Sequence, residues 1–496
     1  MNKQLIFIGL FFIALNSFGQ KNPFLDRAYW KSNPSIQDID QKIAEGHDIS
    51  ALTSSAFDAV SWALIEKTNN KTIKYLLSKK GNGVNKLTHD GRTYIFWAAY
   101  KDNLEMMQYL VDNGAKTDII DSHGYSVLNF AATTGQLNTK LYDFCVQHGA
   151  KPTEEINHDG ANALLLVAPF IKDVSLIDYF TSKGIDLKST DNQGNGIFNY
   201  AAKTGNIQLM DYLIKQGLPH KELNKAGGNA MIFASRGTRN VTNTLNTYQY
   251  LENLGISPNV ITKEGITPLH SIAYRGKDLG IFNYFLSKGV NINQQNKDGN
   301  TPFLNAALLN SLNIVKFLSK HVKDINTKDK EGKSALTNAI RRNSVDVVSF
   351  LLEKGADVNV KDKKGNNLSY YLIKSYSPRK FESFQEKVTA LSKKGFEIAR
   401  HQEDGNSLYH LALESNDLKL LKWVHENNID VNFKNKNGLT ALHKAAMTAK
   451  DDKILKYLLS IGASKEIKTD FDETVYDLAA ENELLQKNNI NIQFLK

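Results

Sequence analysis

Polar and apolar residues alternate with a long, regular period along most of the chain. Glycines stand in polar stretches at intervals of 33 to 40 residues, at positions 91, 124, 160, 194, 227, 265, 299, 332, 365, 405 and 438. An apolar, alanine-containing segment follows each glycine, and a second apolar segment precedes the next polar stretch. The helical spacing within these segments predicts a turn, a helix, a short turn and a second helix in each period.

The residue types fit this interpretation. Glycine tolerates the positive φ of a tight turn, and alanine pairs such as Ala98–Ala99 and Ala445–Ala446 allow two helices to approach closely. One helix pair cannot bury its own apolar face, whereas stacked pairs share a continuous core. We therefore expect an all-α solenoid of helix-turn-helix units with hairpin or loop tips.

Short motifs point to a family. Thr267-Pro268-Leu269-His270 is a complete TPLH motif, and residues 301–304 and 440–443 are near copies of it. Together with the period, these motifs make residues 55 to 490 resemble the ankyrin repeat family, which implies about twelve repeats plus caps. The resemblance also implies that His270, His443 and the equivalent His410 form hydrogen bonds between neighbouring turns.

The N-terminus has a different pattern. Lys3 precedes an unbroken apolar run from Leu5 to Leu15, which is too short to cross a bilayer. Ser17 and Gly19 fit a signal-peptidase site, so residues 1–19 are interpreted as a signal peptide cleaved after Gly19. We therefore expect a periplasmic or secreted protein with no membrane span in the mature chain. A buried N-terminal helix is the alternative.

The repeat pattern also sets the expected domain limits. Residues 20–54 are expected to form an N-terminal helical cap with an apolar stripe of Ile36, Ile39 and Ile43. The repeat array that resembles the ankyrin family is expected to cover residues 55–470. Residues 471–496 form a C-terminal capping repeat, in which Glu473 replaces the tip glycine.

Composition narrows the classes of function. The chain has 496 residues, of which 41% are hydrophobic and 23% charged, as is ordinary for a folded protein. The single cysteine, Cys145, excludes an intrachain disulfide framework and is expected to be a buried, inert thiol. No phosphate-binding glycine loop, zinc-protease helix, serine-hydrolase elbow or calcium loop occurs. We accordingly expect no catalytic residue, no cofactor and no metal ion.

Three consecutive tips carry a histidine next to or near an aspartate, namely His89, His123 and His158. They could form a metal-binding or pH-sensitive row, or they could be solvated turn residues. Neighbouring tips should lie roughly 10 Å apart, whereas zinc ligands lie about 2 Å from the ion. We therefore favour solvated turns.

The net charge is +9 at pH 7. Part of it comes from lysines at the later tips, which are Lys328, Lys330, Lys333, Lys361, Lys363, Lys364, Lys434 and Lys436. A solvated face is the favoured interpretation, and attraction to an acidic partner is the alternative. Export argues against nucleic acid as the partner.

Binding residues are expected where the fold leaves the sequence free. In the family these are the tips and the two positions after the alanine pair, which face the concave groove. Tyrosine, arginine and exposed leucine are enriched at the energetic centres of protein interfaces. The main candidate patch is Tyr274, Arg275, Leu308, Leu309, Arg341 and Arg342; Tyr100 and Phe170 form a weaker one, and Lys101 and Tyr125 complete the set.

The position before the alanine pair changes character along the chain. It holds Trp62, Trp97, Phe130, Leu166, Tyr200 and Phe233 in the earlier repeats, and Ser271, Asn305 and Asn338 later. Packing between repeats accounts for the apolar group, but the pattern alone does not explain the polar one. Two repeats are also longer, around residues 236–244 and 375–384, and we interpret both insertions as tolerated loops rather than functional ones.

These observations lead to one leading hypothesis. We expect an exported, monomeric, non-catalytic scaffold that captures another exported protein on its concave face. The alternative is a dedicated inhibitor or regulatory subunit of one exported enzyme. An enzyme with an unrecognised site is a third hypothesis.

Overall fold

The computed structural model describes residues 22–496, so the expected signal peptide lies outside the described residues. Within this range the chain is helical, and its single isolated β-bridge joins Lys328 to Ser334. The predicted all-α fold class is confirmed. Every helix between residues 22 and 496 is too short or too polar to cross a lipid bilayer.

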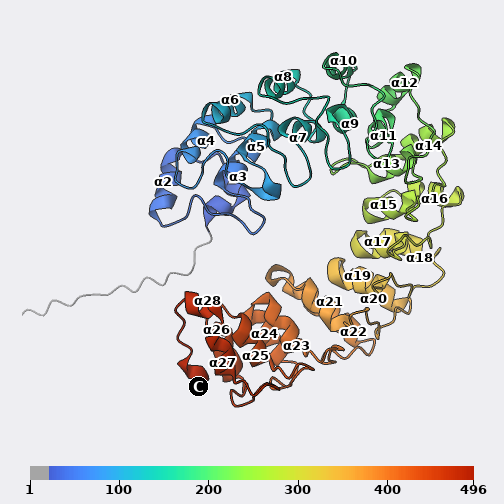
Figure 1. Ribbon diagram of the computed structural model, residues 1–496. Coiled ribbons are helices and arrows are strands. Elements are labelled where there is room, and N and C mark those ends of the chain that lie inside the picture. Colours follow the sequence, from blue (N-terminus) through green and yellow to red (C-terminus); the bar gives the residue numbers. More distant parts are fainter. Residues whose placement is uncertain (1–21) are drawn as a thin grey trace, which may run out of the picture. The chain divides into compact units, whose positions relative to one another are not determined.

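Most helices follow one another in pairs, each pair forming one repeat (Figure 1). The helix bounds are α1 (Arg27–Lys31), α2 (Ile36–Ala44), α3 (Ala59–Ile65), α4 (Asn70–Leu77), α5 (Tyr94–Tyr100), α6 (Leu104–Asp112), α7 (Val127–Thr133), α8 (Thr139–Gln147), α9 (Ala163–Val167), α10 (Ser175–Ser182), α11 (Ile197–Ala202), α12 (Ile207–Lys215), α13 (Ala230–Arg236), α14 (Leu245–Asn253), α15 (Pro268–Arg275), α16 (Leu279–Ser287), α17 (Pro302–Leu309), α18 (Leu312–Ser319), α19 (Ala335–Arg342), α20 (Val345–Glu353), α21 (Leu368–Ser375), α22 (Phe381–Ser392), α23 (Leu408–Ala412), α24 (Leu418–His425), α25 (Ala441–Thr448), α26 (Lys453–Ser460), α27 (Val475–Ala480) and α28 (Glu483–Lys487). Short 3-10 turns are η1 (Pro23–Leu25), η2 (His89–Gly91), η3 (Ala168–Phe170), η4 (Pro378–Lys380), η5 (Leu413–Ser415) and η6 (Gln493–Leu495).

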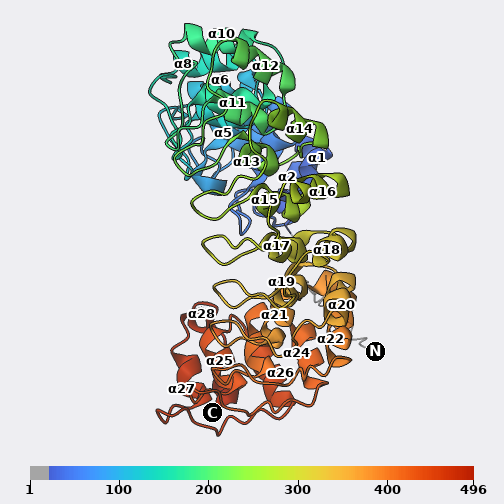
Figure 2. The same ribbon diagram turned by 90° about the vertical axis from the view of Figure 1, so that its right-hand side faces the viewer.

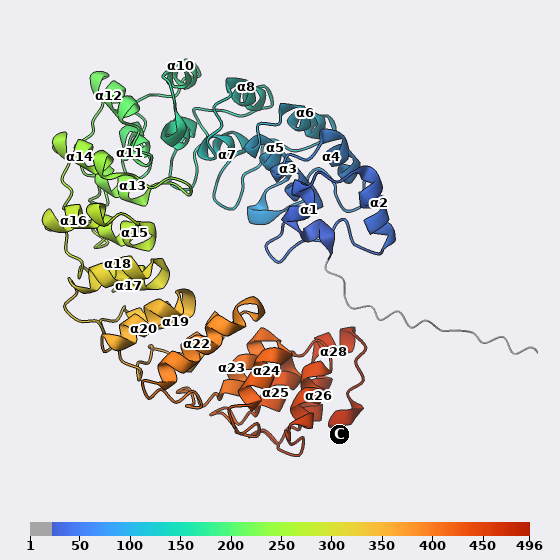
Figure 3. The same ribbon diagram turned by 180° about the vertical axis from the view of Figure 1, so that it is seen from behind.

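The helices pack into two compact units. The first contains the described residues up to 201 together with 206–220, and the second contains 202–205 and 221–496. In the first unit, α3, α5, α7 and α9 pack in sequence to form one row (Figure 1), of which Figure 3 shows α3, α5 and α7 from behind. In the second unit, α13, α15, α17, α19 and α21 form such a row, and α16, α18, α20 and α22 lie along its outer side (Figure 1).

A typical repeat of the second unit begins at a hydroxyl cap. Thr301 precedes α17, and its side chain accepts a hydrogen bond from the Leu304 N–H while Pro302 occupies the first turn. The helix ends at Asn310, whose side-chain amide donates to the carbonyls of Ala273 at 2.8 Å and Gly276 at 2.9 Å in the preceding repeat. One short segment therefore starts a helix, stops it and attaches it to its neighbour.

Backbone hydrogen bonds join the tips. The N–H of Lys297 donates to the carbonyl of Glu264, and the N–H of Lys330 donates to that of Asp298, both at 2.8 Å. The loops before α15, α17 and α19 consequently project on the same side of the unit (Figure 2). Gly265 has a φ of +76°, and a Cβ on it would lie 2.6 Å from the carbonyl oxygen of Gln295, so only glycine fits this turn.

Two of the three histidines at TPLH positions make the contacts that the resemblance implied. The third, His443, accepts from the Thr440 N–H at 3.1 Å, but its buried Nε2 makes no hydrogen bond to the next tip in the described residues. His270 Nδ1 accepts from the Thr267 N–H at 3.0 Å, and Nε2 donates to the carbonyl of Asn300 in the next tip at 3.1 Å. His410 makes the same contacts with Ser407 and with the carbonyl of Leu439. The expected link between neighbouring turns is confirmed at both positions.

The polar residues before the later alanine pairs now have a physical role. The Asn305 amide donates to the carbonyl of His270 at 2.8 Å, and the Asn338 amide donates to that of Leu304 at 3.2 Å. Lys444, at the same position of a later repeat, donates to the His410 carbonyl at 3.0 Å. The second unit thus joins its first helices by hydrogen bonds, whereas Trp97 and Phe130 in the first unit are buried between helices.

The two ends of the described chain differ from the central repeats. In α2, Ile39 is fully buried, whereas Ile36 and Ile43 are half-buried, so the expected stripe is only partly covered. In the last repeat, Thr474 caps α27 together with Asp477, which stands where other repeats have histidine.

Candidate protein-binding surface

The six residues of the main candidate patch lie at the C-terminal ends of three adjacent helices. Tyr274 and Arg275 end α15, Leu308 and Leu309 end α17, and Arg341 and Arg342 end α19. Since α15 packs on α17 and α17 packs on α19, the fold brings these residues together along one row. We call them the α15–α19 surface.

The α15–α19 surface alternates covered and open side chains. Arg275, Arg341 and Arg342 are exposed, and so is Leu309 with 44% of its surface accessible. Tyr274 is half-buried; burial raises the pKa of its hydroxyl, against a hydrogen bond from Asn300. The surface therefore offers a half-buried aromatic residue and an exposed leucine among exposed cations, as protein interfaces do.

The three arginines have no counter-ion in the part of the chain that the structure describes. Among residues 22–496, no carboxylate oxygen lies within 4.0 Å of the guanidinium nitrogens of Arg275, Arg341 or Arg342. Their hydrogen-bonding capacity is therefore directed to solvent and is available to a ligand.

The other four candidates belong to the first unit and are more tightly packed. The Lys101 ammonium lies 4.6 Å from the ring centroid of Tyr100, and burial lowers the pKa of Lys101. Phe170 covers Gly135 so closely that a Cβ on Gly135 would lie 2.8 Å from its ring. Tyr125 is half-buried. These side chains support neighbouring repeats of the first unit, whereas the α15–α19 surface belongs to the second.

Two of the three tip histidines of the first unit approach the same carboxylate. Nε2 of His89 lies 3.4 Å and Nε2 of His123 lies 3.2 Å from Asp90 Oδ2, whereas His158 packs on the preceding tip beside Gly124. Two of the three side chains thus approach one another more closely than the helix-layer spacing suggested. In the described part of the chain, no group of three or more His, Cys, Asp or Glu side chains is arranged to hold a metal ion.

Sequence reasoning missed a buried arginine in the same region. Arg92 Nη2 lies 2.7 Å from Asp121 Oδ2, and its Nη1 lies 3.1 Å from Asp90 Oδ2. Its guanidinium carbon is 4.3 Å from the ring centroid of Phe130. The sequence does show Arg92 as a charged residue between a tip glycine and a TPLH-like segment. Only the fold shows that Asp121 of the next tip is its partner.

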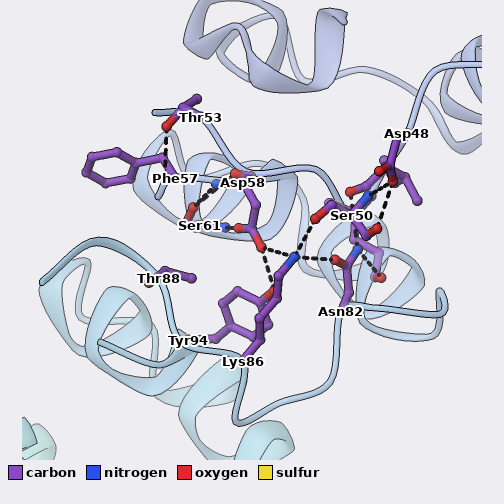
Figure 4. Close-up of polar contacts among 12 residues, drawn as sticks. Asp48, Ser50, Thr53, Phe57, Asp58, Ser61, Asn82, Lys86, Thr88 and Tyr94 are labelled. Atoms are coloured by element: carbon purple, nitrogen blue, oxygen red, sulfur yellow. Dashed lines mark hydrogen bonds and ion pairs between the residues drawn. The ribbon is translucent and has the colours of Figure 1, made fainter. Parts of the chain in front are cut away.

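A second buried polar cluster, centred on Lys86, was also missed (Figure 4). The Lys86 ammonium lies 2.8 Å from Asp58 Oδ2 and donates to the Ser50 carbonyl at 2.7 Å and to Asn82 Oδ1 at 3.2 Å. The Tyr94 hydroxyl donates to the same Asp58 oxygen at 2.7 Å. Burial, helped by the Asp58 charge, holds the pKa of Tyr94 well above its ordinary value. Because three acceptors use all three ammonium protons, this cluster is a structural link.

Cys145 is buried, and burial raises the pKa of its thiol to about 12. The thiol is therefore protonated at neutral pH, which agrees with the expected inert core residue.

Comparisons with known proteins agree with this architecture. The family model described as ankyrin repeats (3 copies) matches residues 60–156, 243–329, 269–362 and 381–490, which cover more than half of the chain. Over 250 residues the chain is 25% identical to a putative ankyrin repeat protein of Acanthamoeba polyphaga mimivirus, covering 48% of this chain and 29% of that protein. Over 94 residues it is 32% identical to the Notch-regulated ankyrin repeat-containing protein B of Danio rerio, covering 18% of this chain and 85% of that protein.

A third relative carries an enzyme name. Over 193 residues the chain is 24% identical to a palmitoyltransferase of Lachancea kluyveri, covering 37% of this chain and 25% of that protein. The chain therefore spans less than a third of the length of both the viral protein and the palmitoyltransferase.

Proposed function

Because the chain belongs to the ankyrin repeat family, we propose that it is a non-catalytic scaffold that binds another protein through the α15–α19 surface. The observation that carries this proposal is the row of exposed Arg275, Leu309, Arg341 and Arg342 at adjacent helix ends, with no counter-ion for the arginines in the described residues. Such positions contribute little to the fold, and exposed arginines beside apolar side chains are typical of energetic centres in protein interfaces.

We propose further that the mature chain begins at Gln20, is monomeric and acts outside the cytoplasm. The apolar run from Leu5 to Leu15 and the small residues Ser17 and Gly19 support export. N-terminal sequencing of the protein recovered from the periplasm or the medium should start at Gln20. Recovery of the full-length chain in the cytoplasm alone would contradict export.

Site-specific photo-crosslinking tests the binding surface. A photo-reactive amino acid at Leu309 in the exported chain should crosslink one partner protein, because Leu309 lies in the middle of the α15–α19 surface. The matched control carries the same group at Lys320, an exposed residue that caps the end of α18. Capture at Leu309 should fall at least about tenfold when Tyr274→Ala and Arg341→Ala are combined, since each removes an interface anchor.

The outcomes separate the alternatives. Equal capture from Lys320, or undiminished capture by the double variant, would contradict the proposed surface. If the crosslinked partner is an enzyme whose activity changes on binding, the protein is a regulatory subunit or inhibitor rather than a passive scaffold.

A further inference from the structure

A pocket adjoins the α15–α19 surface in the second unit. It lies between α19 and α21 and the loops that precede them, and has a volume of about 420 Å³. Its charged lining residues are Glu331, Lys333, Arg341, Asp362, Lys364 and Lys374. Arg341 belongs both to this pocket and to the α15–α19 surface. We call it the basic pocket.

Asp362, a half-buried acid of the basic pocket, already accepts several hydrogen bonds. Asp362 Oδ2 accepts from the Tyr371 hydroxyl at 2.7 Å and from the Asn366 amide at 2.9 Å, and Oδ1 accepts from the Lys364 N–H at 2.9 Å. Burial by itself raises the pKa of Asp362, but the hydrogen bonds from Asn366 and Tyr371 outweigh it and hold the pKa below its ordinary value. Asp362 therefore stays ionised, and together with Glu331 it offsets only part of the charge of the four cations that line the pocket.

Most of the cations of the pocket lack a partner. Lys374 pairs with Glu414 of the next repeat. In the part of the chain that the structure describes, no carboxylate oxygen lies within 4.0 Å of the charged nitrogens of Arg341, Lys333 or Lys364. Hydrogen bonding to Glu414 raises the pKa of Lys374, while the charge of Arg341 opposes this rise, so the two cations repel each other. Like charges held together in a concave site gain most from a bound anion.

The geometry of the cations favours carboxylates on an extended chain. Arg341 offers a planar fork that can bind a carboxylate through two parallel hydrogen bonds, and the lysines add point charges around it. The half-buried Tyr370 supplies a flat wall, with the Lys374 ammonium 5.6 Å from its ring centroid. Arg342, Leu309 and Arg275 continue from the pocket along neighbouring helix ends. A partner segment that contains several acidic residues and an apolar residue is complementary to this row of basic and apolar side chains.

We propose that the basic pocket binds the carboxylate side chains of an extended acidic segment of the partner protein, with Arg341 as the two-pronged anchor. This proposal rests on the proposed function and specifies the chemistry of the partner. A phosphate-bearing ligand and a nucleic acid are the other anions that a basic pocket attracts, and the experiment separates them.

Fluorescence anisotropy of a labelled octaglutamate peptide with the full mature chain tests the proposal. The peptide should bind with an affinity that falls as salt is raised, and an octaglutamine peptide should not bind. Arg341→Gln should weaken octaglutamate binding about 10- to 100-fold, the range expected for a lost pair of charge-assisted hydrogen bonds. Lys364→Gln should weaken it less, because it removes a point charge without a fork.

Lys320→Gln is the matched control, since it removes an exposed lysine of the same unit outside the pocket, and it should change the affinity less than twofold. Circular dichroism should show that all variants keep the helix content of the parent chain. Arg341→Lys should recover only part of the affinity, because it restores the charge and not the fork.

Three results would overturn the proposal. The first is that octaglutamate does not bind even at millimolar concentration in low salt. The second is that Arg341→Gln and Lys320→Gln weaken octaglutamate binding equally. The third is that inorganic phosphate or a short single-stranded DNA binds more tightly than octaglutamate and loses this binding in the Arg341→Gln variant. If Leu309 still crosslinks one partner in any of these cases, only the acidic-segment proposal fails. If that crosslink is also absent, the scaffold function fails with it.

Discussion

His410 illustrates how single side chains hold neighbouring repeats together. Its Nδ1 accepts the Ser407 N–H, and its Nε2 donates to the Leu439 carbonyl at 2.9 Å, so the ring must be neutral to make both contacts. Burial lowers the pKa of His410 to about 4, from 6.5 for an unperturbed histidine. Protonation therefore favours the unfolded chain.

The pH dependence of stability follows from this shift. Between pH 6.5 and about 4 the unfolded chain binds a proton at His410 that the folded chain does not, so stability falls as the pH falls through this window. The expected loss from this one residue is about 3 kcal/mol, complete near pH 4. Urea denaturation of the His410→Gln variant should show a correspondingly weaker dependence on pH.

The matched control for that measurement is His321→Gln, since His321 is an exposed histidine of the same unit. It should leave the pH dependence of the parent chain intact. If the stability of His410→Gln depended on pH as strongly as that of the parent chain, a group other than His410 would cause the pH dependence.

The longer repeat near residues 375–384 shows what an insertion does at the scale of an element. The second helix α22 has twelve residues, against eight in α18 and nine in α20. Phe384 is buried, and its ring centroid lies 4.7 Å from that of Trp423 in α24. In the same helix, the buried Lys387 donates to the Ile340 carbonyl near the end of α19 at 2.8 Å, and burial lowers its pKa to about 8. Phe384 of the insertion therefore packs on α24, and Lys387, just beyond it, attaches α22 to the helix that carries Arg341.

Phe384→Ala should lower the free energy of unfolding by about 3 to 5 kcal/mol, as expected for emptying a buried aromatic site. Phe471→Ala is the matched control, because 83% of the Phe471 surface is accessible, and its effect should stay within about 0.5 kcal/mol. Chemical denaturation followed by circular dichroism measures both. Similar effects of the two substitutions would show that the insertion is only a tolerated loop.

At the scale of the whole molecule, the contacts of each repeat are mostly with the repeats before and after it. Stability in such an array is close to a sum of repeat terms and neighbour interfaces, so damage should stay local. The Lys86 cluster offers a test, because it links the residues just before α3 to the loop after α4 and to α5.

Lys86→Met leaves the fully buried Asp58 without its cation and should cost about 3 kcal/mol. Amide hydrogen exchange should accelerate by about two orders of magnitude over α3 to α6 and stay unchanged over α15 to α19. Lys80→Met, which removes an exposed lysine nearby, should change neither region. Faster exchange over α15 to α19 would contradict independent behaviour of distant repeats.

The repeat order, the helix pairs and the TPLH contacts could be read from the sequence alone. They depend on local signals, namely tip glycines, capping residues and apolar residues at helical spacing, which recur often enough to be recognised. Of the six residues predicted for the main patch, four are exposed, whereas Tyr274 and Leu308 are half-buried. The position of a residue within a repeat determines the face that it occupies, but not how far its neighbours cover it.

Only the tertiary structure determined which polar side chains of neighbouring repeats contact each other. The Lys86 cluster, the Arg92–Asp121 pair and the hydrogen bonds of Asn305 and Asn338 join groups about one repeat apart, and no local pattern tells which of many polar residues will meet. The basic pocket is of the same kind, since Lys333 and Lys364 come from tips and Arg341 and Lys374 from helix ends. Side-chain direction and burial depend on how repeats stack, and stacking is a property of the folded array.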